Sequence, residues 1–109
     1  MAANKRAVEL SEDIKLVLGA LNMRYPNYVP GESIFRAVLG VSTDYTKVRL
    51  RRDMTYLNDK GYVRFKGLHG IDAMAITVND CAFALTAAGF ELANSLTADP
   101  AIGPMHETE

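Results

Sequence analysis

The sequence predicts an α+β fold in which three helices are followed by a β-hairpin and a last helix. Up to about residue 60, apolar residues recur at the spacing of one helical face, whereas from Tyr62 they alternate with other residues, as in half-buried strands. The chain has 109 residues, of which 49% are hydrophobic and 23% are charged. That length and composition indicate one globular domain and exclude a disordered chain.

The first helix is expected from about Lys5 to Arg24. Tyr25 and Pro26 end it, because a proline disfavours helical geometry at the residue before it. Its buried face is an apolar stripe at helical spacing. The stripe consists of Leu10, Ile14, Val17, Leu18 and Leu21.

A short second helix is expected from Gly31 to Leu39, because apolar residues pair four positions apart within it. Gly40 follows it as a left-handed stop. The connection to the next helix is only a few residues long, which favours two helices packed against each other across a tight turn.

The third helix is expected from about Asp44 to Lys60. Ser42 or Thr43 serves as its N-cap, and Gly61 follows its end. Its apolar stripe is narrow and most of its remaining surface is basic, so one side is expected to remain uncovered. The stripe consists of Leu50, Met54 and Leu57.

The region after Tyr62 is expected to form strands, with glycines in the turn between them. Thr86 is the expected N-cap of the last helix. The alternating strand residues are Val63 and Phe65, then Met74, Ile76 and Val78, with a third short strand over residues 81–85. We expect a domain over residues 1–96 and a flexible tail over residues 97–109, either disordered or loosely draped on the domain, because the tail contains two prolines and a glycine.

The charges are distributed unevenly along the chain. Between Arg36 and His69 lie eight basic and three acidic residues, so this stretch carries +5, while the rest of the chain carries −6. The net charge is therefore only −1. Such asymmetry predicts a local anion-binding surface on a nearly neutral protein.

Two segments, together with the order of the elements, resemble the winged helix-turn-helix superfamily. Residues 50–63 resemble the end of a recognition helix that enters the first strand of a wing through Gly61 and Tyr62. Residues 83–89, with the sequence FALTAAG, resemble the junction between the last wing strand and the final helix. The resemblance covers roughly Ala7 to Leu96.

The combined pattern is similar to a family of small winged-helix proteins of Mu-like prophages, which share this length and a short tail containing proline and glycine. This chain departs from that family in its longer segment from Gly67 to Asp80. The resemblance implies a phage or prophage regulator or accessory protein. Our leading expectation is a cytoplasmic transcriptional regulator, in a phage or bacterial context, whose partner is double-stranded DNA.

The resemblance also implies which residues contact DNA, because it places the third helix in the major groove. Candidates for base edges or nearby phosphates are Thr43, Tyr45, Thr46 and Lys47. Candidates for phosphate contacts are Arg36, Arg49, Arg51 and Arg52, with Arg64, Lys66 and His69 on or near the wing.

Each assignment has an alternative. The basic helix face is also consistent with a solvated surface that pairs with neighbouring carboxylates, and Tyr45 with a residue at the edge of the core. A pI near 6.1 favours a rival function, a winged-helix adapter that binds another protein and not DNA. Convergence of the basic residues on one face favours DNA, whereas their neutralisation by acids favours the adapter.

Neither an enzyme nor a cofactor is expected. No phosphate-binding glycine loop occurs, and Glu12 and Asp13 are the only adjacent carboxylates. The single cysteine, Cys81, excludes an intramolecular disulfide, fits a reducing compartment, and lies far in sequence from both histidines, so no zinc site is expected.

No apolar run is long enough for a membrane span, and the N-terminus does not resemble a signal peptide. A homodimer is expected through the first and last helices, because one recognition helix reads only a few base pairs. The alternative is that the same apolar residues pack within one chain. They include Leu10, Leu21, Phe90 and Leu96.

Overall fold

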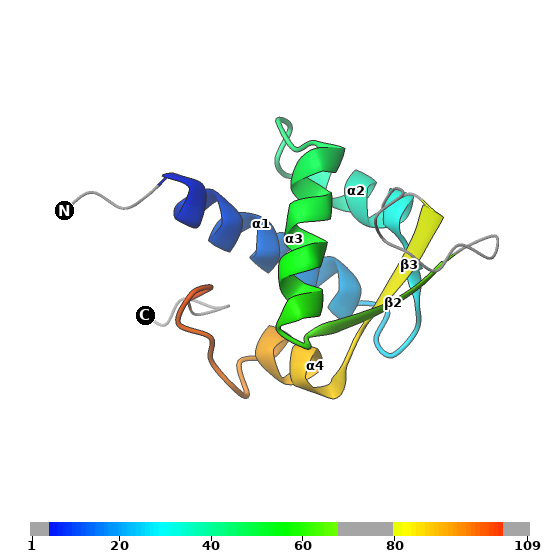
Figure 1. Cartoon of the computed structure of the whole chain (residues 1–109), viewed down its shortest axis with the longest axis vertical. Coiled ribbons are helices and arrows are strands. Elements are labelled where there is room, and N and C mark those ends of the chain that lie inside the picture. Colours follow the sequence, from blue (N-terminus) through cyan, green and yellow to red (C-terminus); the bar gives the residue numbers. More distant parts are fainter. Residues whose placement is uncertain (1–4, 68–79, 104–109) are drawn as a thin grey trace.

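The computed structural model describes residues 5–67 and 80–103. These residues form four helices and a small three-stranded antiparallel sheet, which confirms the α+β class (Figure 1). No helix among them is long and apolar enough to cross a membrane. In chain order the elements are α1 (Lys5–Asn22), β1 (Val29–Pro30), α2 (Gly31–Leu39), α3 (Lys47–Asp59), β2 (Val63–Gly67), β3 (Cys81–Leu85) and α4 (Ala87–Ala93).

The central strand of the sheet is β3, which pairs antiparallel with β1 on one side and with β2 on the other. All five residues of β3 are buried. β1 was not expected, because a two-residue strand offers no alternation to detect. Its Pro30 suits an edge strand, since proline has no N–H to donate. The strand expected over Met74, Ile76 and Val78 lies outside the described residues.

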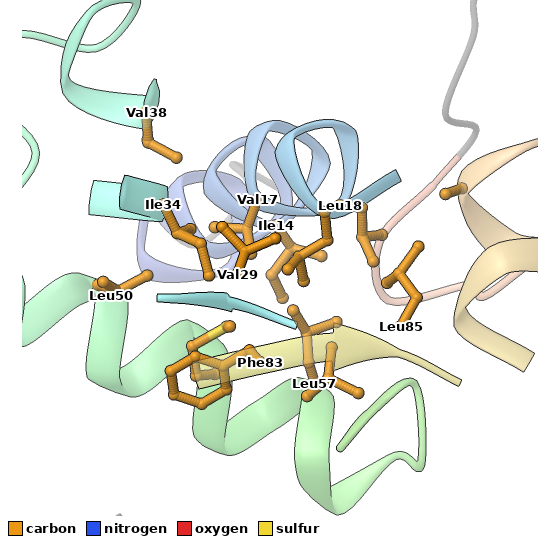
Figure 2. Packing of buried hydrophobic residues seen from close by; sticks show 14 of the residues in the cluster. Ile14, Val17, Leu18, Val29, Ile34, Val38, Leu50, Leu57, Phe83 and Leu85 are labelled. Carbon is orange, nitrogen blue, oxygen red and sulfur yellow. The ribbon is translucent and has the colours of Figure 1, made fainter. Parts of the chain in front are cut away.

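One hydrophobic core lies between the helices and one face of the sheet. Figure 2 shows Ile14 of α1 and Ile34 of α2 on one side of this core, with Leu57 of α3 and Phe83 of β3 on the other. The apolar stripes expected on the first and third helices are confirmed, although Leu10 is only partly buried. The fully buried stripe residues are Ile14, Val17, Leu18, Leu21, Leu50, Met54 and Leu57.

The start of α3 differs from the expectation. The helix begins at Lys47 instead of Asp44, and its N-cap is Thr46. The Thr46 hydroxyl oxygen accepts a 3.1 Å hydrogen bond from the backbone N–H of Arg49. Thr43 therefore lies in the turn before the helix and does not cap it.

The turn between α2 and α3 explains this difference. Gly40 is right-handed, with φ −63°, and not left-handed as expected. The backbone continues in a helical sense, because the N–H groups of Gly40 and Ser42 donate to the carbonyls of Arg36 and Val38, at 3.1 and 2.8 Å. Ser42 thus completes the end of α2 instead of capping α3.

Two other helix-end expectations are confirmed. Gly61, after α3, is left-handed, with φ +78°. Thr86 is the N-cap of α4, and its hydroxyl oxygen accepts a 3.1 Å hydrogen bond from the N–H of Gly89.

The first part of the expected tail is packed on the domain as far as Gly103, which corrects the expectation of a flexible segment. Ile102 is only 2% exposed and belongs to the core, and its carbonyl accepts a hydrogen bond from the Ser11 hydroxyl of α1. Asp99 is also buried, and its carboxylate accepts a 2.7 Å hydrogen bond from the Tyr62 hydroxyl. The folded unit therefore extends past residue 96.

Candidate nucleic-acid interface

The outward side of α3 presents Val48, Arg51 and Thr55, which lie three and four positions apart and so share one helical face. All three are exposed, and Val48 is 80% exposed. The Thr55 hydroxyl donates a 2.8 Å hydrogen bond to the Arg51 carbonyl. Sequence reasoning selected only Arg51, although projecting the helix from the apolar stripe would have placed Val48 and Thr55 beside it.

Arg49 and Arg52 lie on the flank of α3 that faces α1. Arg49 donates to both carboxylate oxygens of Asp13, at 2.8 and 3.0 Å. Arg52 donates to Asp13 and to Glu9, at 2.7 Å each. The Asp13 side chain is only 3% exposed. These two arginines, expected to contact phosphates, are thus held in ion pairs that fasten α3 to α1.

Tyr45 lies in the core, 3% exposed, which corresponds to the core alternative and not to a base contact. Its hydroxyl donates a 2.7 Å hydrogen bond to the fully buried Asp53, which also accepts from Arg52 at 2.9 and 3.1 Å. Burial raises the pKa of Asp53 to about 7, against the opposing effects of the Tyr45 and Arg52 hydrogen bonds. Burial, followed by the nearby Asp53 charge, also raises the pKa of Tyr45.

A second ionic contact joins α2 to the start of α3. Glu32 lies 3.3 Å from Arg36 and 3.4 Å from Lys47, so two cations share one carboxylate. The Lys47 ammonium also lies 5.5 Å from the centre of the Phe35 ring. Arg36 and Lys47 keep much of their side chains exposed.

The turn before α3 places Thr43 on the surface, whereas the Thr46 hydroxyl is used by the N-cap. The neighbouring Asp44 is exposed and accepts a 3.0 Å hydrogen bond from the Ser42 hydroxyl. That bond, with a smaller effect from Arg49, lowers the pKa of Asp44, so its carboxylate is charged at neutral pH. Its Oδ2 lies 3.3 Å from Nη1 of Arg49, so this exposed carboxylate also pairs with Arg49.

The outer side of the sheet carries a second basic group. Arg64 and Lys66 are both exposed on β2, and both approach the ring of Tyr28, which directly precedes β1. The distances to the ring centre are 5.5 Å from the Arg64 guanidinium carbon and 4.5 Å from the Lys66 ammonium. Sequence reasoning did not select Tyr28, and no local pattern links it to β2. His69 lies outside the described residues.

The basic residues therefore differ in their carboxylate partners, and Arg36 and Lys47 share Glu32. Arg49 and Arg52 are neutralised on α1, and Lys60 lies 4.0 Å from the buried Asp99. Three basic residues of the expected site have no carboxylate within ion-pair distance among residues 5–67 and 80–103. They are Arg51, Arg64 and Lys66.

The residues expected at a dimer interface occupy mixed positions. Leu21 is fully buried in the core of its own chain, and Phe90 stacks on Tyr25 with ring centres 4.3 Å apart. Leu10 is partly buried, whereas Leu96 is 68% exposed. Leu21 and Phe90 thus pack within one chain.

Within the part of the chain that the structure describes, no group of three His, Cys, Asp or Glu side chains could hold a metal ion. Cys81 is buried, and burial raises the pKa of its thiol. Comparison of the chain with family models, with curated proteins and with solved structures finds no match.

Proposed function

We propose that this chain is a winged helix-turn-helix protein that binds double-stranded DNA with α3 in the major groove, as a transcriptional regulator of phage or bacterial type. The observation that carries the proposal is that one side of α3 is anchored and another is exposed. Arg49 and Arg52 anchor one flank to α1, whereas Val48, Arg51 and Thr55 face outward without cover.

The order of the elements supports this proposal. In a winged helix the recognition helix follows a short turn and leads directly into the wing strands, as α3 here follows residues 40–46 and leads into β2. Figure 1 shows α3 lying across the front of the molecule, with α1 and α2 behind it. The B-DNA major groove is about 12 Å wide and admits one helix, so an anchored helix with one open face suits it.

The chemistry of the outward face also supports the proposal. An arginine pairs with the O6 and N7 atoms of guanine, an apolar methyl packs on the methyl of thymine, and a threonine hydroxyl bonds to either kind of edge. Arg51 and Val48 offer the first two contacts within one face, and the Thr55 hydroxyl, whose proton bonds to the Arg51 carbonyl, can still accept a hydrogen bond. Arg36, Lys47, Arg64 and Lys66 lie nearer the ends of α3 or on the sheet and would contact phosphates.

The test is fluorescence anisotropy with a labelled random 30-base-pair duplex, from low to physiological salt. We expect the logarithm of the binding constant to fall linearly with the logarithm of salt concentration, by about 0.9 per phosphate contacted. Arg51→Ala should weaken binding several-fold. Arg24→Ala, which removes the same charge from an exposed site two residues after α1, is the matched control and should bind like the wild type. Absence of binding even at low salt contradicts the proposal.

A protein-binding adapter is the second candidate, and two observations favour it. Two of the basic residues on α3 are neutralised internally, and the exposed Val41 and Val48 lie near the start of α3, at 71% and 80% exposure. If the duplex does not bind, Val48→Asp becomes the informative variant. It should abolish capture of a protein partner that the wild type retains, while Met23→Asp, at an exposed apolar site on the end segment of α1, should not.

The homodimer is a separate part of the proposal. Leu96 is the most exposed of the apolar residues assigned to that interface. Light scattering during size-exclusion chromatography should give twice the monomer mass of 12.0 kDa, and Leu96→Asp should return it to the monomer value.

A further inference from the structure

On the outer face of the sheet, Tyr28 lies beside two cations of β2, which is the edge strand on the other side of β3. In the ladder, Arg64 pairs with Ala84 and Lys66 with Ala82, while Pro30 of β1 pairs with Ala82 from the opposite side. When the register between β1 and β3 is continued by one residue, Tyr28 lies opposite Ala84. Tyr28 and Arg64 thus flank the same residue of β3 from opposite edges.

The small residues of β3 allow this contact across a whole strand. Ala82 and Ala84 alternate with Cys81, Phe83 and Leu85, which belong to the core, so the two alanines face the other side of the sheet. Neighbouring strands lie about 4.8 Å apart, and alanine leaves the space above β3 open to long side chains from both edges. Both alanines are nevertheless almost fully buried.

The two cations at this site approach the same ring, and neither is paired with a carboxylate of the described residues. The Lys66 ammonium and the Arg64 guanidinium lie 4.5 and 5.5 Å from the same ring centre, within cation–π range. No carboxylate of the described residues lies within ion-pair distance of either. Two positive charges beside the Tyr28 ring form a site that can bind an anion.

We propose that Tyr28 is a positioning residue, which holds Arg64 and Lys66 together as a phosphate-binding site for the backbone of the nucleic acid that α3 contacts. The inference rests on the proposed function for the identity of the anion. The negative face of the ring attracts both cations and fixes their side chains before binding, so less conformational entropy is lost when a phosphate arrives.

The first test compares Tyr28→Leu with Tyr28→Phe in the duplex titration. Leucine keeps an apolar cover over Ala84 but removes the aromatic face, whereas phenylalanine keeps the ring and loses only the hydroxyl. We expect Tyr28→Leu to bind the random duplex about threefold to tenfold more weakly, and its salt slope to fall by about 1 to 2, as one or two phosphate contacts are lost. Tyr28→Phe should match the wild type in both quantities.

The second test separates this inference from the proposed function, because it needs neither α3 nor DNA. Inorganic tripolyphosphate is titrated into the wild-type protein while NMR follows the Nε–H of Arg64 and the terminal CH₂ of Lys66. We expect the two signals to shift together and to saturate, with the same shifts in Tyr28→Phe and much smaller ones in Tyr28→Leu. Duplex binding lost with these shifts intact would overturn only the proposed function.

Three outcomes overturn the inference. The first is a Tyr28→Leu protein with the wild-type affinity and salt slope. The second is a Tyr28→Phe protein as weak as Tyr28→Leu, which would assign the effect to the hydroxyl. The third is a wild-type protein in which tripolyphosphate does not shift Arg64 and Lys66 together, and this outcome decides the matter even if Tyr28→Leu does not fold. A further check is the Arg64→Gln, Lys66→Gln background, in which Tyr28→Leu should change the affinity no further.

Discussion

Arg49 binds Asp13 through two contacts, of 2.8 Å between Nη2 and Oδ1 and 3.0 Å between Nε and Oδ2, and this pair joins α3 to α1. The same carboxylate accepts a 2.7 Å hydrogen bond from Arg52. One buried acid on α1 therefore holds two arginines of α3. This contact holds one flank of α3 against α1, and together with the buried stripe of Leu50, Met54 and Leu57 it orients the helix.

Replacement of Asp13 should destabilise the fold. Asp13→Ala leaves two arginines without their shared partner, and breaking a buried ion pair costs about 3–5 kcal/mol. Because Arg49 and Arg52 keep part of their surface in water, we expect a smaller loss, about 2–3 kcal/mol, measured by urea unfolding. Glu12→Ala is the matched control, since Glu12 is the exposed neighbour on α1. A loss for Asp13→Ala no larger than for Glu12→Ala would show that the pair adds nothing to stability.

The stability of the protein should depend on pH through Asp53. Burial raises its pKa from the ordinary 3.8 to about 7, so between these values the folded protein holds a proton that the unfolded chain has released. The contribution of Asp53 to stability therefore falls as pH rises from about 4 to 7, by at most about 1.4 kcal/mol per pH unit, and is constant above 7. The lowered pKa values of Glu9, Asp44 and Asp99 act in the opposite direction, but below about pH 4.5.

Asp53→Asn isolates this effect because it removes the titration and keeps the side-chain shape. The difference in unfolding free energy between the variant and the wild type should grow in favour of the variant from pH 4.5 to 7 and then stop changing. Asp59→Asn, at an exposed position on the same helix, provides the comparison and should run parallel to the wild type. Parallel curves for Asp53→Asn as well would mean that Asp53 is charged throughout this range.

Gly89 is required by a close approach between α4 and the start of β2. A Cβ at this position would lie 2.0 Å from the carbonyl oxygen of Tyr62, which is backbone and has little freedom to move. Gly89→Ala should therefore cost about 1–3 kcal/mol of stability, as overpacking does. The same change at Gly19 in α1, where nothing lies within 4 Å, should stabilise the protein by about 0.5–1 kcal/mol. Similar effects at the two positions in thermal unfolding would refute this account.

The sequence predicted the helices, the strands β2 and β3 and the apolar stripes. Each of them has a periodic pattern of apolar residues or a capping residue at its end. It did not reveal which way the arginines of α3 face. The positions of two acidic residues would have indicated the direction of these arginines. Asp13 and Asp53 lie at stripe spacing, three residues after Leu10 and Leu50, so their carboxylates had to enter the interior and required cations there. Arg49 and Arg52 flank that interior and supply them.

Two other parts of the fold had no local signal at all. β1 contains two residues and is defined by its pairing with β3, far away in sequence. Tyr28 approaches Arg64 and Lys66 only because that pairing places it there. Contacts of this kind depend on sheet register, which neither composition nor periodicity of a single segment records.

The packing of the chain after α4 supplies a last test, since Ile102 is the one large apolar residue in the sequence of residues 97–103 and is 2% exposed in the core. Ile102→Ala should cost about 2–4 kcal/mol in urea unfolding, as for other large-to-small changes in a core. Met23→Ala removes a large apolar side chain at a site just after α1 that is 85% exposed, and should change stability by less than about 0.5 kcal/mol. Equal effects of the two changes would mean that residues 97–103 do not pack on α1. Ser11→Ala would then also leave the stability unchanged, because among the described residues the Ser11 hydroxyl donates only to the Ile102 carbonyl.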